Sequence, residues 1–421
     1  MPDPIGDTGA LLMRRFDELG AISEEPDKLV RAYGMQSLRR AQDLVSVWMR
    51  DAGMTVERDA IGNLTGRYEA DFAVTHPKTV VFGGHLDTVR DAGKYDGTLG
   101  VLSGIAAVAH LQAAGTWLPF AVEVVAFADE ESYRFPTMYL GSGYWTGNFD
   151  PVLLEGLDET GISLAQGMRD FGCNPDNACL PVMPRRDILA FVELHIEQGP
   201  VLEAEDLPVG IVSSIAGASK FLVTVKGQAG HAGTVPMHLR RDALVGASEC
   251  VLAINEIATA GASGGLVATV GWQVTMPGAK NVIPGRVEFS IDLRHPSDTA
   301  RLTAVDQVKT TLHEIGQRRG LGIDIVDVPG ADATPMDAGL MDTWRDVFRE
   351  SGLQPRELAS GAGHDAVMVA KIAPVSMLFL RCRGGLSHHP GESIRADDAA
   401  LGVTLLSRFL DRLATRGITC A

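Results

Sequence analysis

The sequence contains few cysteines, and none of them form a CxxC pair. Five cysteines occur in 421 residues, and they are widely scattered: Cys173, Cys179, Cys250, Cys382 and Cys420. An odd number of scattered cysteines is typical of reduced thiols in a cytoplasmic protein, not of a disulfide framework. Cysteine is therefore a poor candidate for a metal ligand or a nucleophile, and we expect a cytoplasmic location.

The chain also lacks an excess of basic residues. Its 37 Lys and Arg residues stand against 53 Asp and Glu residues, so that the formal net charge is −16. Nucleic acids and anionic membranes bind basic surfaces, so neither is expected as the main partner. We see no apolar run as long as a membrane span. The first residues, MPDP, have neither the basic nor the apolar region of a secretory signal, so we expect no secretion.

The length of the chain and its first half indicate an α/β domain. A chain of 421 residues is too long for one compact core and suits two domains. Apolar strands alternate here with amphipathic helices, a pattern that predicts a sheet whose active edge lies at the carboxyl ends of its strands. The expected elements are a first helix over 36–52, strands over 79–82, 122–127 and 191–194, and a helix over 98–114.

From residue 215 the order of elements changes to βαββαβ, which predicts an inserted ferredoxin-like module. Its expected elements are strands over 221–226, 266–270, 287–293 and 322–327 and helices over 240–260 and 298–316. Helices over 337–351 and 397–412 and a strand over 376–380 then return to the first domain. We therefore expect a mixed sheet flanked by helices in residues 1–214 and 330–421, and an inserted α+β domain in residues 215–329.

Polar residues gather where the apolar strands of the first domain end. In an α/β sheet these ends meet at one edge, which would bring two or three imidazoles and several carboxylates into one crevice. Imidazole and carboxylate ligands suit Zn²⁺, Mn²⁺, Co²⁺ or Ni²⁺ and are typical of metal-assisted hydrolysis. The residues at these ends are His85, Asp87, Asp129, Glu130, Glu131, His195, Ser387, His388 and His389.

Each of these groups has an ordinary explanation when it is taken alone. His85 would more often be a packing histidine, the pair Glu130 and Glu131 a solvated turn, and His388-His389 a turn before proline. His195 is harder to explain in this way, because it belongs to a strand that should be largely buried. Their joint occurrence at four strand ends favours a metal site.

Seven motifs follow one another along nearly the whole chain: GGHLDTV…GKYDGTLGV, FADEESYRFP, VELHIEQGPVLE, GHAGTVPM, NVIPG…DLRH, GAGHDA and GGLSHHPGE. Together they resemble the amidohydrolase branch of the M20 metallopeptidase family. Members of this branch include N-carbamoyl-L-amino acid hydrolases, β-ureidopropionases, ureidoglycolate amidohydrolases and allantoate amidohydrolases. One such motif is weak evidence, but seven in order are specific for the family.

The resemblance implies a metal-dependent catalytic domain with two divalent ions per subunit, Zn²⁺ or Mn²⁺, with Co²⁺ or Ni²⁺ as alternatives. Asp87 would orient the ring of His85, Glu130 would be the general base, and a cis peptide bond would follow Asp96. The family pattern Ser-His-any-Pro favours His388 over His389. The implied ligands are His85, Asp96 as the bridge, Glu131, His195 and His388.

The resemblance also implies residues that contact the substrate, which would be a small carboxylated ureido compound. His231 would stabilise an oxyanion from the inserted domain, reaching the active site of a neighbouring subunit, so that a homodimer with a lid and dimerisation domain is expected. Arg294 suits a carboxylate, although a surface ion pair is an equally good explanation. On the sequence alone, a strand-end cap or a turn is the favoured explanation for Gln198 and Asn281, and His364 fits a structural loop residue or helix-start donor better than a metal ligand. The implied substrate-binding residues are Gln198, His231, Asn281, Arg294 and the backbone of Gly363.

The expected reaction is cleavage of the C–N bond of a linear ureido group. The stretches DAGKYDGTLG, GHAGTVPM and RCRGGLSH resemble the allantoate amidohydrolases most. N-carbamoyl-L-amino acids, ureidoglycolate and N-carbamoyl-β-alanine are the alternatives, ahead of a dipeptide or a binding protein without activity. Ser132, Tyr133 and the sequence HHPGE depart from the usual family pattern beside the expected ligands, and so they leave the substrate open.

Overall fold

The computed structural model describes residues 4–180, 185 and 187–416. These residues form two compact units. The first unit contains the residues up to Ser213, the segment Met336–Leu358 and the residues from His364 onward, and the second contains Ser214–Pro335 and Ala359–Gly363. The chain thus returns to the first unit at residue 336, where we expected 330. The short loop 359–363, which carries Gly363, belongs to the second unit, and no sequence signal pointed to this.

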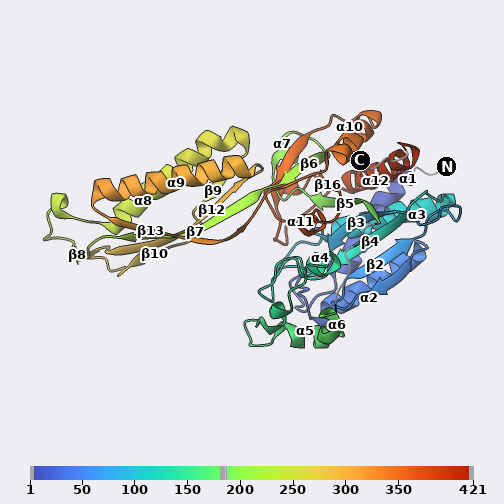
Figure 1. The fold of residues 1–421 in the computed structure, drawn as a ribbon, viewed down its shortest axis with the longest axis horizontal. Helices are drawn as coiled ribbons and strands as arrows, with labels where there is room; N and C mark the ends of the chain where they lie inside the picture. Colours follow the sequence, from blue (N-terminus) through green and yellow to red (C-terminus); the bar gives the residue numbers. More distant parts are fainter. Residues whose placement is uncertain (1–3, 181–184, 186, 417–421) are drawn as a thin grey trace. The chain divides into compact units, whose positions relative to one another are not determined.

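A mixed sheet forms the centre of the first unit (Figure 1). Strand β3 is parallel to its neighbours β4 and β5, and β5 is parallel to β16. Strand β6 also pairs with β15 (Glu357–Ser360) and β14 (Thr334–Pro335). The order across the sheet is β1 (Thr55–Arg58), β2 (Leu64–Tyr68), β4 (Ala121–Phe127), β3 (Thr79–His85), β5 (Ile188–Ile196), β16 (Val375–Leu380) and β6 (Val209–Ile215).

The four parallel strands β3, β4, β5 and β16 are buried along their whole length. Such strands are covered on both faces, which accounts for their continuous apolar sequences. Polar side chains at their ends are therefore also desolvated, and each needs a partner to offset that cost.

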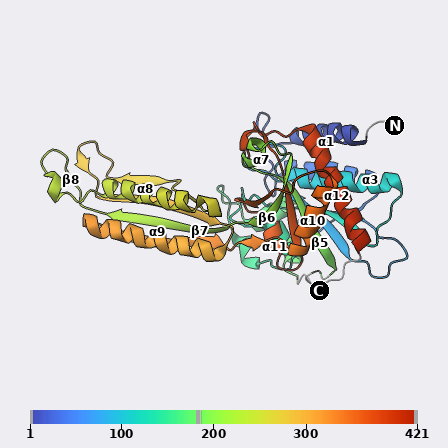
Figure 2. The same cartoon turned by 90° about the horizontal axis from the view of Figure 1, so that it is seen from above.

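Helices pack around this sheet. Helix α3 packs against β3, and α12 packs against α3 and α1 (Figures 1 and 2). The expectation that the first helix begins at 36 is wrong, because α1 precedes it and buries Leu12, Phe16 and Leu19. The helices are α1 (Pro4–Gly20), α2 (Gln36–Asp51), α3 (Thr98–Ala114), α4 (Leu140–Trp145), α5 (Leu164–Phe171), α6 (Pro175–Ala178), α7 (Val201–Ala204), α10 (Ala338–Glu350), α11 (Ala366–Val369) and α12 (Ala396–Arg416).

The second unit has the predicted βαββαβ order, with two long helices packed on a sheet (Figure 1). Helices α8 (Ala243–Gly261) and α9 (Asp298–Arg319) pack against β7 and β12. A separate pair, β8 (Gly230–His231) and β11 (Val282–Ile283), carries the first two residues of the GHAGTVPM motif. The sheet order is β10 (Gln273–Met276), β12 (Arg286–His295), β7 (Gly217–Lys226) and β13 (Gly322–Ala331), and β9 (Val267–Thr269) also pairs with β12.

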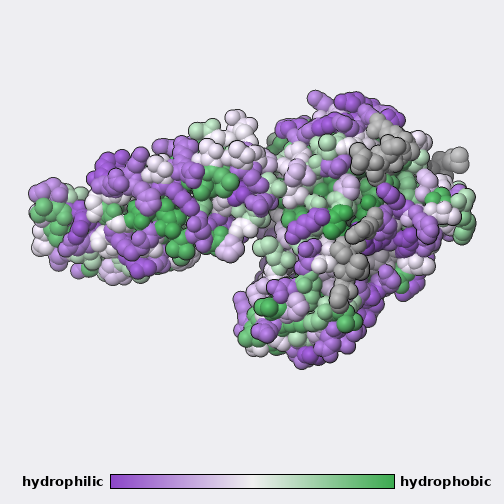
Figure 3. Space-filling view, in the orientation of Figure 1, coloured by the Kyte–Doolittle hydropathy of each residue, from purple (hydrophilic) through white to green (hydrophobic). Residues whose placement is uncertain are grey.

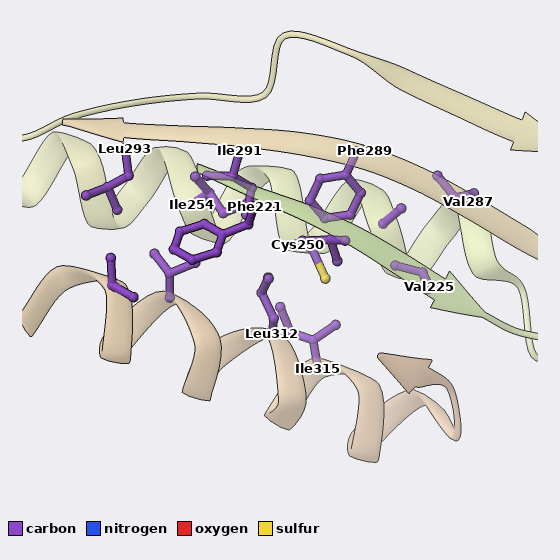
Figure 4. Packing of buried hydrophobic residues seen from close by; sticks show 14 of the residues in the cluster. Phe221, Val225, Cys250, Ile254, Val287, Phe289, Ile291, Leu293, Leu312 and Ile315 are labelled. Carbon is purple, nitrogen blue, oxygen red and sulfur yellow. The ribbon is translucent and has the colours of Figure 1, made fainter. Parts of the chain in front are cut away.

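The second unit has its own hydrophobic core (Figure 4). Phe221 of β7 and Phe289 of β12 project toward the helices, where they meet Cys250 of α8 and Leu312 of α9. Alternate residues of β12 are buried, as expected for a sheet covered on one face. The face of each unit that Figure 3 shows is largely hydrophilic, with smaller hydrophobic patches between the polar residues.

One helical stretch, Ala243–Gly264, is long and apolar enough to cross a membrane by length and composition alone. The expectation that no apolar run reaches this length is therefore wrong by this measure. The stretch includes α8, whose residues Ala247, Cys250 and Ile254 lie in the core of the second unit. Packing in that core accounts for the buried face of the helix, which is about a third of the apolar stretch, whereas Val245 and Leu252 are exposed.

Candidate metal centre

Most of the polar residues expected to meet at the carboxyl edge of the sheet do meet there, but Asp129 is hydrogen-bonded to Thr137 and His389 to Gly391 instead. His85 is the last residue of β3, and it lies beside Phe127, the last residue of β4. His195, near the end of β5, pairs with Phe379 near the end of β16. The loops after these strands then carry the acidic residues and His388. Parallel pairing thus places side chains from distant parts of the sequence at one edge.

Asp96 lies at the centre of this group, in the loop before α3. Its Oδ1 atom is 3.0 Å from Nε2 of His195 and 3.5 Å from Nε2 of His85. A Cβ atom at Gly97 would lie 2.3 Å from the His85 ring, and Gly97 has a φ of +66°. Glycine is therefore required after Asp96 to let the ring approach.

The hydrogen bonds of the two histidines decide which nitrogen is available to a ligand. Nδ1 of His85 is 3.0 Å from the carbonyl oxygen of Asp87, and Nδ1 of His195 is 2.9 Å from the carbonyl oxygen of Ile196. A carbonyl only accepts, so each Nδ1 carries a proton and each neutral ring presents the Nε2 lone pair to Asp96. A lone pair and a carboxylate oxygen at 3.0 Å repel each other unless a proton or a cation lies between them.

Asp87 contacts the group differently from the expected role. Its backbone carbonyl, not its carboxylate, lies within hydrogen-bond distance of His85, since Oδ1 is 3.7 Å from Nδ1. Its Oδ2 atom accepts a hydrogen bond of 3.0 Å from the backbone N–H of Glu131. Asp87 thus links the loop after β3 to the loop after β4.

A second group lies on the other oxygen of Asp96. Nε2 of His388 is 3.5 Å from Oδ2 of Asp96 and 3.3 Å from Oε2 of Glu131. His388 has a φ of +54°, in the left-handed region that side chains other than glycine rarely adopt. His389 instead accepts a hydrogen bond of 3.0 Å from the N–H of Gly391. The geometry therefore favours His388 over His389.

Two further residues hold the carboxylate of Asp96. Gln198 donates a hydrogen bond of 2.8 Å to Oδ2, and the hydroxyl of Ser387 donates another of 2.5 Å to the same atom. Gln198 also donates to Ser387 at 3.1 Å and has a φ of +56°. Gln198 was expected to bind substrate, and here its amide is directed at the central carboxylate.

The acidic residues are crowded enough to shift one another's protonation. Burial raises the pKa of Glu130 well above its usual range, and the charges of Asp365, Glu131 and Asp87 add to this. Burial and the charge of Asp96 raise the pKa of Glu131 to about 8. Burial also acts to raise the pKa of Asp96. His195 and His85 lower that pKa by more, so it lies well below its usual range.

This arrangement fits divalent metal ions. The Nε2 atoms of His85 and His195 face one oxygen of Asp96, and His388 and Glu131 face the other, so two groups of ligand atoms share a single carboxylate. Imidazole and carboxylate donors suit divalent transition ions. Positive charge between them would also relieve the crowding of the buried acids.

Some features of the site were not expected from the sequence. The peptide bond between Asp96 and Gly97 is trans, so the expected cis bond is wrong; among the described residues the cis bond is Met276–Pro277. His364 is buried against the ring of His195, with 4.6 Å between ring centroids. Four further residues of this region had no role assigned from the sequence, although each lies in or beside a quoted motif. They are Glu193, Asp365, Ser387 and Glu392.

The substrate-binding residues expected in the second unit lie in two places. His231 and Asn281 are neighbours, because His231 pairs with Val282 and the carbonyl of Asn281 accepts from the N–H of Ala232. Both residues are exposed. Nδ1 of His231 accepts a hydrogen bond of 3.0 Å from the N–H of Gly233, so a neutral ring carries its proton on Nε2.

Arg294 lies near the end of β12, in the same unit as the loop that carries Gly363. Two of its nitrogens contact the two carboxylate oxygens of Asp292, each at 2.8 Å. A third donates to the carbonyl oxygen of Gly361 at 2.5 Å. The ion pair that was the alternative explanation for Arg294 is therefore present, and it fixes the guanidinium beside the Gly363 loop.

Comparison with known proteins gives relatives over nearly the full length. An N-carbamoyl-L-amino-acid amidohydrolase of Pseudomonas sp. is 37% identical over 93% of this chain and 95% of its own. An allantoate deiminase of Arabidopsis thaliana is 37% identical over 94% of this chain and 81% of its own. A crystal structure of a hydantoinase/carbamoylase family amidase from Burkholderia multivorans is 32% identical, covers 96% of this chain and 97% of its own, and has a TM-score of 0.89.

These relatives confirm the predicted mixed α/β fold and the prediction of a hydrolase that acts on C–N bonds other than peptide bonds. The family model for peptidase family M20/M25/M40 matches residues 81–412, which include the ends of β3, β4, β5 and β16. The chain therefore belongs to peptidase family M20/M25/M40.

Proposed function

We propose that this protein is a metal-dependent amidohydrolase that cleaves the C–N bond of a linear ureido group in a small carboxylated substrate. The observation that carries the proposal is the position of Asp96, whose two oxygens face two separate groups of ligand atoms. A shared carboxylate of this kind is suited to two ions that act on one substrate.

In this proposal two divalent ions are held by residues of the first unit. His85 and His195 would hold one ion, Glu131 and His388 the other, and Asp96 both. Bound ions of this kind lower the pKa of water and polarise the carbonyl oxygen of the substrate. Zn²⁺ and Mn²⁺ suit the donor set best, and Co²⁺ and Ni²⁺ also fit it.

The proton transfers are assigned to Glu130. Its Oε2 atom is 3.8 Å from Nε2 of His85, and its raised pKa brings it closer to the working range of a general acid–base catalyst. Glu130 takes a proton from the attacking water and later gives it to the leaving nitrogen. Asp87 holds the backbone of Glu131, next to Glu130 in sequence, and so fixes this loop.

Residues of both units are assigned to the substrate. The protonated Nε2 of His231 is a suitable donor for the oxyanion that forms at the ureido carbon. Arg294 can bind a carboxylate, and Asn281 offers a donor and an acceptor. Gln198, already hydrogen-bonded to Asp96, and the Gly363 backbone complete the set. We further propose a cytoplasmic homodimer, in which the second unit serves as lid and dimerisation domain and His231 acts in the site of the partner subunit.

Allantoate is the favoured substrate, and an N-carbamoyl-L-amino acid is the second candidate. The motifs resemble the allantoate group most, but relatives named for either substrate are 37% identical to this chain. Both compounds offer a planar ureido carbon and a carboxylate, so the same residues suit either.

Ammonia release from a substrate panel tests the proposal. Ammonia is measured for allantoate, ureidoglycolate, N-carbamoyl-L-amino acids and N-carbamoyl-β-alanine, and free amino acids are measured for a dipeptide, whose hydrolysis yields no ammonia. Each compound is tested with the metal-loaded enzyme and after chelation. We expect two ions per chain, turnover of one ureido compound, and loss of that turnover in chelator. A folded protein that takes up neither Mn²⁺ nor Zn²⁺, or one that hydrolyses only the dipeptide, would refute it.

A further inference from the structure

A buried carboxylate outside the ligand set anchors the loop that carries Asp96. Glu392 is 4% exposed and follows His388 by four residues. Its Oε1 atom accepts two backbone hydrogen bonds, from the N–H of Tyr95 at 2.8 Å and from the N–H of Asp96 at 3.1 Å. The other oxygen, Oε2, has no hydrogen-bond partner within the described part of the chain. One oxygen of Glu392 thus holds the peptide groups on which Asp96 is mounted.

The chain around Glu392 leaves this carboxylate little freedom to move. A Cβ atom at Gly93 would lie 2.3 to 2.4 Å from atoms of the Glu392 side chain, so the two loops approach as closely as glycine allows. The Tyr95 ring is buried edge-on against Phe16, with 4.9 Å between ring centroids, which is a further contact that holds the Asp96 loop. The N–H of Glu392 bonds to the carbonyl of His389 at 3.0 Å, which closes a turn just after His388.

The loop 387–392 therefore holds Asp96 through two sets of hydrogen bonds. Ser387 binds the carboxylate through Oδ2, and Glu392 binds the backbone through its Oε1. His388 lies between these two anchors in sequence and faces the same Oδ2 atom at 3.5 Å. Any shift of one loop against the other would change the distance between His388 and Asp96.

We propose that Glu392 is a positioning residue that sets the distance between Asp96 and His388 and thereby the affinity of the metal site. This inference rests on the proposed two-ion function and assigns Glu392 no contact with substrate. Residues that orient metal ligands typically change affinity about 10- to 100-fold when they are removed. We expect the ion held by Glu131 and His388 to be the more affected, because both loops contribute to it.

The test compares Glu392→Ala with Glu392→Gln. Glutamine keeps an oxygen that can accept both backbone hydrogen bonds, whereas alanine removes it. We expect E392A to bind Zn²⁺ or Mn²⁺ about 10- to 100-fold more weakly than the parent protein, and E392Q to recover most of that loss. Affinity is measured by competition with a chromogenic chelator, and the thermal midpoint of the metal-free protein is recorded for each variant.

Asp158→Ala is the matched control. Asp158 is also a largely buried carboxylate in the first unit, and its Oδ1 accepts from the backbone N–H groups of Thr160 and Ile162, each at 2.9 Å. It contacts none of the proposed ligands. We expect D158A to lower the thermal midpoint while metal affinity stays unchanged, which separates loss of stability from loss of positioning.

A second variant keeps the test decisive if E392A does not fold. Gly93→Ala keeps Glu392 in the sequence but forces its side chain away from the Asp96 loop, and it should also weaken metal binding. Parent affinity in G93A, or in E392A where that variant folds, would overturn the inference, even if the thermal midpoint falls. A parent protein that binds no divalent ion would instead overturn the proposed function, so the two failures are distinguishable.

Discussion

The two units present their polar residues in opposite ways. In the first unit, His85, Asp96 and His195 are at most 4% exposed and contact one another directly. In the second unit, His231 and Asn281 are exposed on a short strand pair, and Arg294 is already paired with Asp292. The buried group is complete within one chain, whereas the exposed residues contact no such group within their own unit. Changes in the first unit should therefore affect metal binding, whereas changes in the second should affect the contacts with substrate and leave metal binding unchanged.

The largest effect should follow from Asp96→Ala, because this residue alone belongs to both ligand groups. We expect loss of both ions and a fall in turnover of about 10⁴-fold or more, since little catalysis is left without the metal site. Metal analysis of the dialysed protein and ammonia release check this. Retention of one tightly bound ion would show that the two groups are independent.

Glu130→Gln should separate chemistry from metal binding within the first unit. The amide cannot take a proton from water, so we expect turnover to fall about 10²- to 10⁴-fold while both ions stay bound. The measurements are kcat and metal content of the same preparation. Near-parent turnover would exclude Glu130 as the base, and loss of an ion would show that it acts as a ligand.

His388→Ala and His389→Ala test the second ligand group with adjacent residues. Nε2 of His388 faces both Asp96 and Glu131, whereas His389 accepts from the turn at Gly391. We expect H388A to bind only one of the two ions. Its turnover should fall at least about 10²-fold, because the proposed reaction requires both ions. H389A should keep both ions. The reverse result would assign the ligand to His389.

The difference between the units also explains which site residues could be predicted from the sequence. Strand ends are visible as apolar runs followed by polar residues, and parallel pairing brings them to one edge without further information. His85, Glu131, His195 and His388 could be expected together for this reason. Family resemblance was needed to single out Asp96, which lies in a loop, and to choose Glu130 over Glu131 as the base.

Contacts between loops could not be predicted from the sequence. Nothing in the order of residues indicates that Glu392 accepts the N–H groups of Tyr95 and Asp96, almost 300 positions earlier. The pairing of Arg294 with Asp292 was one of two explanations with equal weight, because a charged residue at a strand end suits an ion pair and a substrate equally well. Helix α1 was missed although Leu12, Phe16 and Leu19 have helical spacing.

The smallest of these effects should follow from Arg294→Ala in the second unit. Loss of a charge-assisted hydrogen bond to a substrate carboxylate costs about 1.5–3 kcal/mol, so KM should rise about 10- to 100-fold with little change in kcat or metal content. Arg286→Ala is the matched control, because Arg286 lies on the same strand and also pairs with an acid two residues away, Glu288. Equal KM values for R294A and R286A would leave the Asp292 ion pair as the whole role of Arg294. A change of metal content in R294A would instead contradict the division between the units, because it would tie an exposed residue of the second unit to the buried ligands of the first.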